Sequence, residues 1–144
     1  MKYLIYLGFL LSNLSCSPLI KYPQSNRQFE QEVSLLERLD LEEKAGEKDL
    51  LFIGSSSIRL WDKIQVDMYP YSSVKRGYGG AHFYDLIHFS ERLVKNHSPK
   101  AILIFVANDI TGSNDSTNLV GDLSPNDVKK LFSCLLYTSD AADE

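Results

Sequence analysis

Cysteine is scarce in this 144-residue chain, which contains only Cys16 and Cys134. Neither residue stands in the spacing of metal ligands, so the sequence predicts neither a zinc site nor a disulfide framework. The chain also lacks an excess of positive charge, since its formal net charge is −4, and this argues against a nucleic-acid partner. A GxxxxGK[S/T] phosphate loop is absent as well, so the sequence does not indicate nucleoside triphosphate binding.

The residues that are present are typical of one globular domain. Hydrophobic residues make up 44% of the chain and charged residues 24%, which is the usual composition of a folded domain. We expect this domain to occupy residues 27–133, because the two ends of the chain have a different character.

The N-terminal residues 1–16 resemble the signal sequence of a bacterial lipoprotein. Lys2 supplies a positive start, an apolar run too short to span a bilayer follows, and the segment closes on small residues before Cys16. The resemblance implies an exported, periplasmic or outer-membrane-attached protein with a lipidated Cys16 and an extended tether at residues 17–26. Asn13 stands where such signals usually have leucine, so simple secretion and an uncleaved anchor stay open as alternatives.

The C-terminal residues 134–144, CLLYTSDAADE, break the pattern that precedes them. They resemble the translation of a transposase-based sequencing-library adapter, so we expect the native protein to continue beyond Ser133 with a different sequence. A genuine helix end over residues 131–137, followed by a short acidic tail, is the alternative. On the adapter interpretation, neither cysteine belongs to the folded domain.

The central part of the chain alternates between helical and strand patterns. Strands are predicted at residues 50–53, 72–75 and 101–107. Helices are predicted at residues 27–44, from Ser56 or Ser57 to Trp61, and from the glycine-rich segment at residues 77–80 to about Asn96. A last helix begins with Ser124 as its N-cap and Pro125 as its first residue. Such a βαβ series predicts an α/β fold with a parallel sheet. The third strand is apolar without alternation, so we expect it to be buried on both faces.

Polar or glycine-rich residues follow each of the three predicted strands. These are Gly54-Ser55-Ser56, then Gly77-Tyr78-Gly79-Gly80, and finally Asn108-Asp109. In a parallel sheet the three strand ends lie side by side, at the edge where open α/β sheets bind ligands. A serine hydroxyl, glycine N–H groups and a side-chain amide at one place supply a nucleophile with an oxyanion hole.

These three segments resemble the Ser, Gly and Asn blocks of the SGNH (GDSL-type) hydrolase superfamily. The first reads FIGSSSIRLW, as in a bacterial branch of that superfamily, the second KRGYGGA and the third VAND. The likeness covers roughly residues 29–132. It implies a three-layer α/β/α, flavodoxin-like fold with a parallel sheet, truncated here after about the third strand.

Position by position, the resemblance implies a serine acyl-transfer site. Ser56 would be the nucleophile, and its own N–H would be one oxyanion donor. The N–H of Gly80, or that of Gly79, would be the second donor, and the side-chain amide of Asn108 the third.

Two features depart from the superfamily pattern. Lys75 and Ala107 stand where the second and third blocks usually have asparagine and glycine. The Asp-x-x-His block that provides the general base is also missing, since the superfamily carries it after two further strands, beyond Ser133. Asp85 and His88 have this spacing, but they follow the glycine-rich block directly, on a helix that leads away from the strand ends.

The resemblance implies an exported esterase that acts on acetylated glycans, lipids or other small esters through a serine acyl-enzyme, without metal or cofactor. The chain as given is expected to be inactive and poorly stable. Its partners would be a small ester and, through Cys16, a membrane surface, whereas its oligomeric state stays open. The alternative is a non-catalytic surface lipoprotein that uses the fold for binding, with the serines merely capping a helix and Asn108-Asp109 merely forming a turn.

Overall fold

The computed structural model describes residues 28–43, 48–110 and 122–140, so the expected signal sequence, its Cys16 and the tether lie outside the described residues. The strands are β1 (Leu50–Gly54), β2 (Ser73–Gly77) and β3 (Ala101–Phe105), and the helices are α1 (Glu30–Glu42), α2 (Ser56–Arg59), α3 (Ile64–Asp67), α4 (Phe83–Val94) and α5 (Pro125–Asp140). No helix in the described ranges is both long and apolar enough to cross a membrane.

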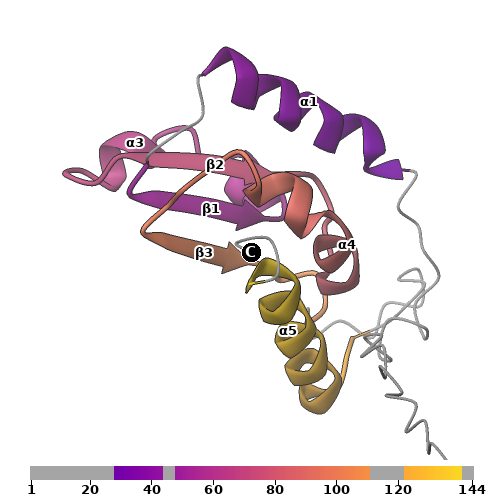
Figure 1. Cartoon of the computed structure of the whole chain (residues 1–144). Coiled ribbons are helices and arrows are strands. Elements are labelled where there is room, and N and C mark those ends of the chain that lie inside the picture. The colour runs from indigo at the N-terminus through magenta and orange to yellow at the C-terminus, as the bar shows by residue number, and fades with distance from the viewer. Residues whose placement is uncertain (1–27, 44–47, 111–121, 141–144) are drawn as a thin grey trace, which may run out of the picture.

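The three strands form one parallel sheet in the order β2-β1-β3 (Figure 1). Gly54 at the end of β1 pairs with Gly77 of β2 on one side and with Phe105 of β3 on the other. The strands therefore end at the same level, and the loops that follow them leave from one edge of the sheet. The predicted α/β class with a parallel sheet is confirmed.

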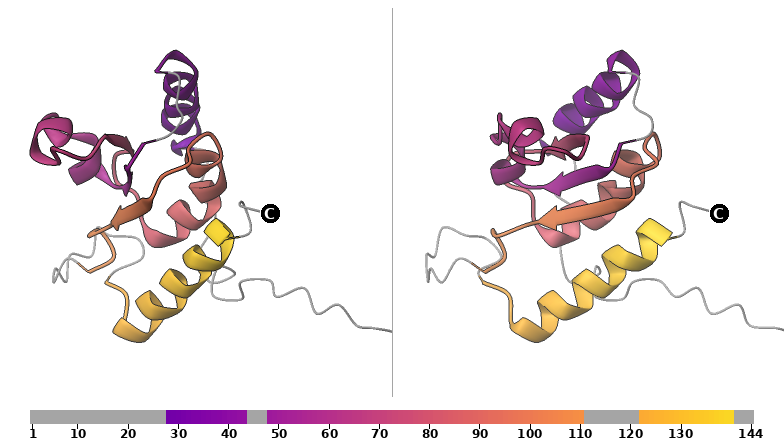
Figure 2. Two further views of the ribbon diagram at one scale, coloured as in Figure 1. Left: turned by 60° about the vertical axis from the view of Figure 1, so that its left-hand side comes forward. Right: turned by 90° about the vertical axis from the view of Figure 1, so that its left-hand side faces the viewer.

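Helices cover both faces of the sheet. The chain moves from β1 outward to β2 and then back across β1 to β3, and right-handed crossovers in opposite directions place their helices on opposite faces. Helices α2 and α3 pack with Phe52 on one face, whereas α1, α4 and α5 enclose the larger core around Leu51 and Ile53. Figure 2 shows α1 toward the β2 edge of the sheet and α5 toward the β3 edge, and α4 contacts both of these helices.

Each strand and helix predicted from the sequence is present, with ends that differ by a few residues. The predicted cap of the last helix is confirmed, because Ser124 Oγ accepts a hydrogen bond from the Asp127 N–H at 3.2 Å and Pro125 begins the helix. Helix α3 is not evident from the sequence, since its four residues are too few to show a period.

Strand β3 contradicts its prediction of burial on both faces. Ile102, Leu103 and Phe105 are 36%, 39% and 50% exposed, and only Ile104 packs against the larger core. The reason is that β3 lies at the edge of the sheet. Its exposed face borders an apolar groove of about 420 Å³, which is lined by Phe52, Ser57, Ile58, Trp61, Met68, Leu103, Ile104 and Phe105.

Helix α5 extends past Ser133 into the segment that resembles an adapter translation. Leu131, Cys134 and Leu135 are buried in the larger core, at the spacing of one helix face. Cys134, which the adapter interpretation places outside the native domain, is thus part of the core in this structure and is disulfide-bonded. Apolar spacing accounts for the burial whatever the origin of the segment, so the adapter interpretation stays a prediction.

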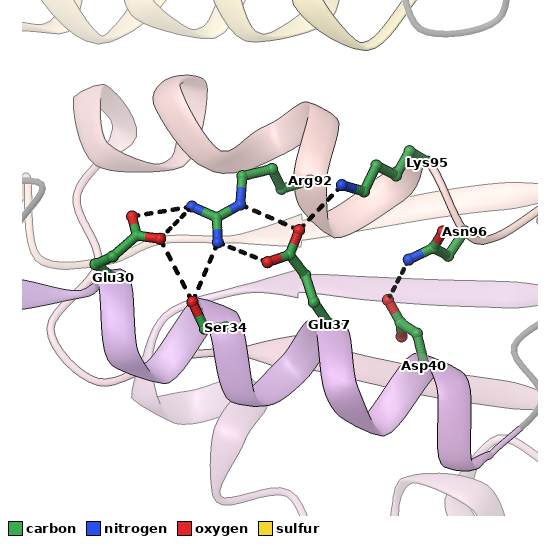
Figure 3. A network of polar contacts seen from close by, with 7 residues as sticks. All are labelled: Glu30, Ser34, Glu37, Asp40, Arg92, Lys95 and Asn96. Carbon is green, nitrogen blue, oxygen red and sulfur yellow. Dashed lines mark hydrogen bonds and ion pairs between the residues drawn. The ribbon is translucent and has the colours of Figure 1, made fainter.

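A polar network joins α1 to α4 (Figure 3). The Arg92 guanidinium donates to Glu30 at 2.8 Å, to Glu37 at 2.6 Å and to Ser34 at 3.3 Å, and Lys95 adds a bond of 3.0 Å to Glu37. The hydrogen bond from Arg92 is the main cause that lowers the pKa of Glu37 to about 2. Because these side chains are partly exposed, each pair stabilises the fold by about 1 kcal/mol or less.

Deeper in the same interface, one ion pair is buried. Arg76 Nε donates to Asp40 Oδ1 at 2.6 Å, and the two side chains are 3% and 1% exposed. Arg76 also donates to the half-exposed Glu43 at 2.8 Å. His97 Nε2 lies 2.9 Å from Asp40 Oδ1 without hydrogen-bond geometry, and burial lowers the pKa of His97.

We expect Asp40→Ala to lower the free energy of unfolding by about 3–5 kcal/mol, because the variant leaves the buried Arg76 charge without its main partner. Arg92→Gln should cost less than Asp40→Ala, since the partners of Arg92 are partly exposed. Urea unfolding followed by circular dichroism measures both losses. Equal losses for the two variants would contradict the ranking of the buried pair above the exposed network.

Candidate active site

The loops that follow β1, β2 and β3 meet at one edge of the sheet. The strand order reverses direction between β1 and β3, and the crevice at the carboxyl ends of such strands is the usual ligand site of open α/β sheets. The Ser55 N–H donates to the Phe105 carbonyl at 3.0 Å, so the serine turn lies directly against the end of β3. Ser56, Gly80 and Asn108 lie in the segments that follow these three strand ends.

The turn after β1 requires glycine at position 54. Gly54 has a φ of +146°, and a side chain at this position would collide with the backbone carbonyl of Phe105. The chain passes at once into α2, which leaves Ser55 buried, Ser56 half-buried and Ser57 exposed. The Ser56 hydroxyl makes no hydrogen bond to a described residue, so its Oγ is open to a bound molecule.

Helix capping does not account for the three serines. Ser55 occupies the N-cap of α2, but its side chain makes no capping hydrogen bond. The Ser55 carbonyl instead accepts a hydrogen bond from the Ile58 N–H at 3.0 Å. The turn is therefore shaped by backbone contacts, and the hydroxyl of Ser56 is not needed to start the helix.

The glycine-rich loop after β2 distinguishes the two candidate donors. The Gly79 N–H donates to Glu32 Oε2 at 3.1 Å, and Glu32 is paired in turn with Arg59 at 3.3 Å. The Gly80 N–H makes no hydrogen bond to a described residue, and Gly80 is exposed with a φ of +75°, which glycine adopts without strain. Of the two glycines, Gly80 therefore has the N–H that a ligand can use.

Asn108 faces this glycine-rich loop from the end of β3. Its Nδ2 donates to the Ala81 carbonyl at 2.8 Å, which uses one of the two amide hydrogens. Asn108 and Asp109 do lie in a turn, in which the Ile110 N–H donates to the Ala107 carbonyl at 3.2 Å. Their side chains nevertheless bond the loop after β2, so the two residues do more than form a turn.

A contact between His82 and Asp109 is one polar feature of this edge that the sequence does not reveal. His82 Nδ1 lies 2.9 Å from Asp109 Oδ1, and the Phe83 N–H donates to Asp109 Oδ2 at 2.8 Å. The hydrogen bond to Asp109 raises the pKa of His82, against the opposing effect of burial. The sequence indicates this contact only in that His82 follows the glycine-rich segment and Asp109 follows Asn108. No periodicity relates positions that are 27 residues apart.

Lys75, one of the departures from the superfamily pattern, has a structural role on β2. Its Nζ donates to the carbonyls of Arg59 and Trp61, at 2.8 and 3.1 Å, and to Asp62 at 3.2 Å. A lysine near the C-terminus of a helix satisfies carbonyls that have no partner in the helix. Lys75 thus secures the far end of the short helix that Ser56 begins.

Of the Asp85 and His88 pair, only Asp85 reaches the residues beside the strand ends. Asp85 is fully buried and accepts a hydrogen bond from the His82 N–H at 3.3 Å, whereas His88 is exposed farther along α4. Within the described residues, no histidine hydrogen-bonds the Ser56 hydroxyl. The edge therefore holds a candidate nucleophile and candidate oxyanion donors without a general base in contact.

We expect Gly54→Ala and Gly80→Ala to differ sharply. Gly54→Ala should cost about 3 kcal/mol or more, because the new methyl group meets the Phe105 carbonyl and the backbone cannot yield there. At Gly80 a new methyl group would only touch the Phe29 ring at 4.0 Å, so Gly80→Ala should cost only about 1–2 kcal/mol for its left-handed backbone. Urea unfolding measures both variants, and a larger loss for Gly80→Ala would contradict the described turn.

Comparison with known proteins yields no relative on which to base a function. No family model, curated protein or solved structure matches this chain. The interpretation of the site rests on its residues and their geometry.

Proposed function

We propose that this protein is an exported SGNH-type esterase that cleaves ester bonds through a serine acyl-enzyme. The observation that carries the proposal is that Ser56, Gly80 and Asn108 follow three parallel strands that end in register at one edge of the sheet, where the strand order reverses between β1 and β3. Acetylated glycans, lipids and other small esters would all present the same carbonyl group to this edge.

The proposed reaction is acyl transfer through Ser56. Its Oγ would attack the ester carbonyl carbon as its proton passes to a histidine in the continuation of the chain beyond Ser133. The leaving alcohol would take that proton, and water would then cleave the acyl-enzyme and restore the serine. The Ser56 N–H, the Gly80 N–H and the Asn108 amide would bind the negatively charged oxygen. Each donor would stabilise the transition state by about 3 kcal/mol.

The natural gene should continue past the codon for Phe132 for about 80 residues or more, enough for the remaining strands of a domain of this size. We expect that continuation to carry an Asp-x-x-His sequence near its end and to lack the adapter-like segment. Amplification from the source DNA and sequencing tests both points. A frame that ends at Glu144, or that continues without this histidine, would favour the binding lipoprotein.

In the complete protein, a fluorophosphonate probe should label Ser56, because the probe reacts with an activated serine hydroxyl. Ser56→Ala should abolish labelling, whereas Ser57→Ala, which removes the neighbouring exposed hydroxyl, should retain it. Peptide mapping by mass spectrometry locates the labelled residue. The 144-residue chain should show no esterase turnover. Turnover that disappears in His88→Ala would contradict the conclusion that this chain lacks the general base.

We also propose that Cys16 anchors the protein to a membrane surface through lipid. The apolar run that closes on small residues before Cys16 supports this proposal.

A non-catalytic surface lipoprotein is the second candidate. The apolar groove beside β3 favours it, because that groove reaches Ser57 and could hold an apolar ligand without any chemistry. A complete protein whose Ser56 resists the fluorophosphonate probe would support this candidate over the esterase.

A further inference from the structure

The loop after β2 and the loop after β3 are joined by hydrogen bonds at the residues that directly follow Gly80. The Asp109 carboxylate contacts His82 Nδ1 at 2.9 Å and accepts the Phe83 N–H at 2.8 Å. In the opposite direction, the Asn108 amide donates to the Ala81 carbonyl at 2.8 Å. Three hydrogen bonds thus connect residues 81–83 to residues 108–109, directly beside Gly80.

Asp109 is placed to act as the centre of this connection. It is 1% exposed, and its backbone carbonyl accepts the Leu123 N–H at 2.8 Å, which adds the segment before α5. A buried carboxylate that accepts several hydrogen bonds is rigid and costly to leave unpaired. The geometry of the loop after β3 therefore depends on His82 and Phe83, which belong to a different loop.

We propose that His82 and Asp109 form a positioning pair that holds the Gly80 N–H and the Asn108 amide in fixed relation, so that the two act as one oxyanion-binding unit. This inference rests on the proposed esterase function, because the oxyanion is the ligand that such a unit would bind. His82 is a positioning residue and not the general base, since it makes no hydrogen bond to the Ser56 hydroxyl.

The charges around His82 give the pair a pH dependence. Asp109 faces His82 from the loop after β3, Asp85 faces it from α4, and the Tyr84 ring stacks on it at 5.1 Å. These carboxylates favour the imidazolium and raise the pKa of His82. The charge-assisted bond is therefore complete below the ordinary histidine pKa and weakens as pH rises through the raised one, although neutral His82 can still donate from Nδ1.

Nuclear magnetic resonance of the complete protein tests the pair without any catalysis. We expect the His82 imidazole to titrate above the ordinary histidine pKa, and the Gly80 amide and Asn108 side-chain amide signals to shift with the same midpoint. Asp109→Asn should lower that pKa and remove the shared midpoint, whereas His88→Gln, at an exposed histidine of the same helix, should change neither. If the Gly80 and Asn108 signals of the unaltered protein do not shift as His82 titrates, the proposal is wrong.

Kinetics of the complete protein provide a second test that a merely structural role would not pass. His82→Ala should lower kcat by about tenfold or more with little change in KM, because the misplaced donors act on the transition state. His82→Asn should recover most of kcat, since its Nδ2 can replace Nδ1 as the donor to Asp109, and it should remove the His82 step from the pH profile. Equal kcat values for His82→Ala and the unaltered enzyme would overturn the proposal.

The two proposals fail in different ways. If the probe does not label Ser56, the esterase fails and the positioning pair loses its ligand, even if the magnetic resonance signals show the two loops to be coupled. If the probe labels Ser56 at the same rate in His82→Ala, the esterase stands and the positioning pair is wrong.

Discussion

The backbone contact between Gly54 and Phe105 fixes the position of the candidate nucleophile. Parallel pairing in register brings the ends of β1, β2 and β3 to one level, and the Ser55 N–H then bonds the Phe105 carbonyl at 3.0 Å. Only glycine permits this approach, because any side chain at position 54 would occupy the place of that carbonyl. Ser56 stands two residues farther along, and its position follows from this contact.

Polar contacts then adjust the two neighbouring loops around the serine turn. Glu32 of α1 binds the Gly79 N–H and pairs with Arg59 of α2, while Lys75 of β2 binds the carbonyls that end α2. Asp109 and Asn108 tie the loop after β3 to the residues that follow Gly80. Each of these contacts joins parts of the chain that are distant in sequence, so the edge is built by tertiary structure and not by any single loop.

The order of strands and helices could be predicted from the sequence, because apolar spacing and caps such as Ser124 are local signals. The strand ends could also be placed at one edge, since parallel topology follows from the βαβ order. The exposure of β3 could not be predicted, because the apolar run AILIF is compatible both with a central strand and with an edge strand that has an open face. Nor could the His82–Asp109 contact or the use of the Gly79 N–H by Glu32, which depend on how separate elements pack.

The register of the sheet also sets an order for folding during synthesis. The central strand β1 is made first, yet its two neighbours come later, and β3 follows roughly fifty residues after β1. Until the ribosome has delivered β3, the carbonyl that Ser55 must bond does not exist, and one side of β1 has no partner. The serine turn would therefore be among the last parts of the sheet edge to take its final form, during an interval in which the unpaired strand is a target for chaperones and for aggregation.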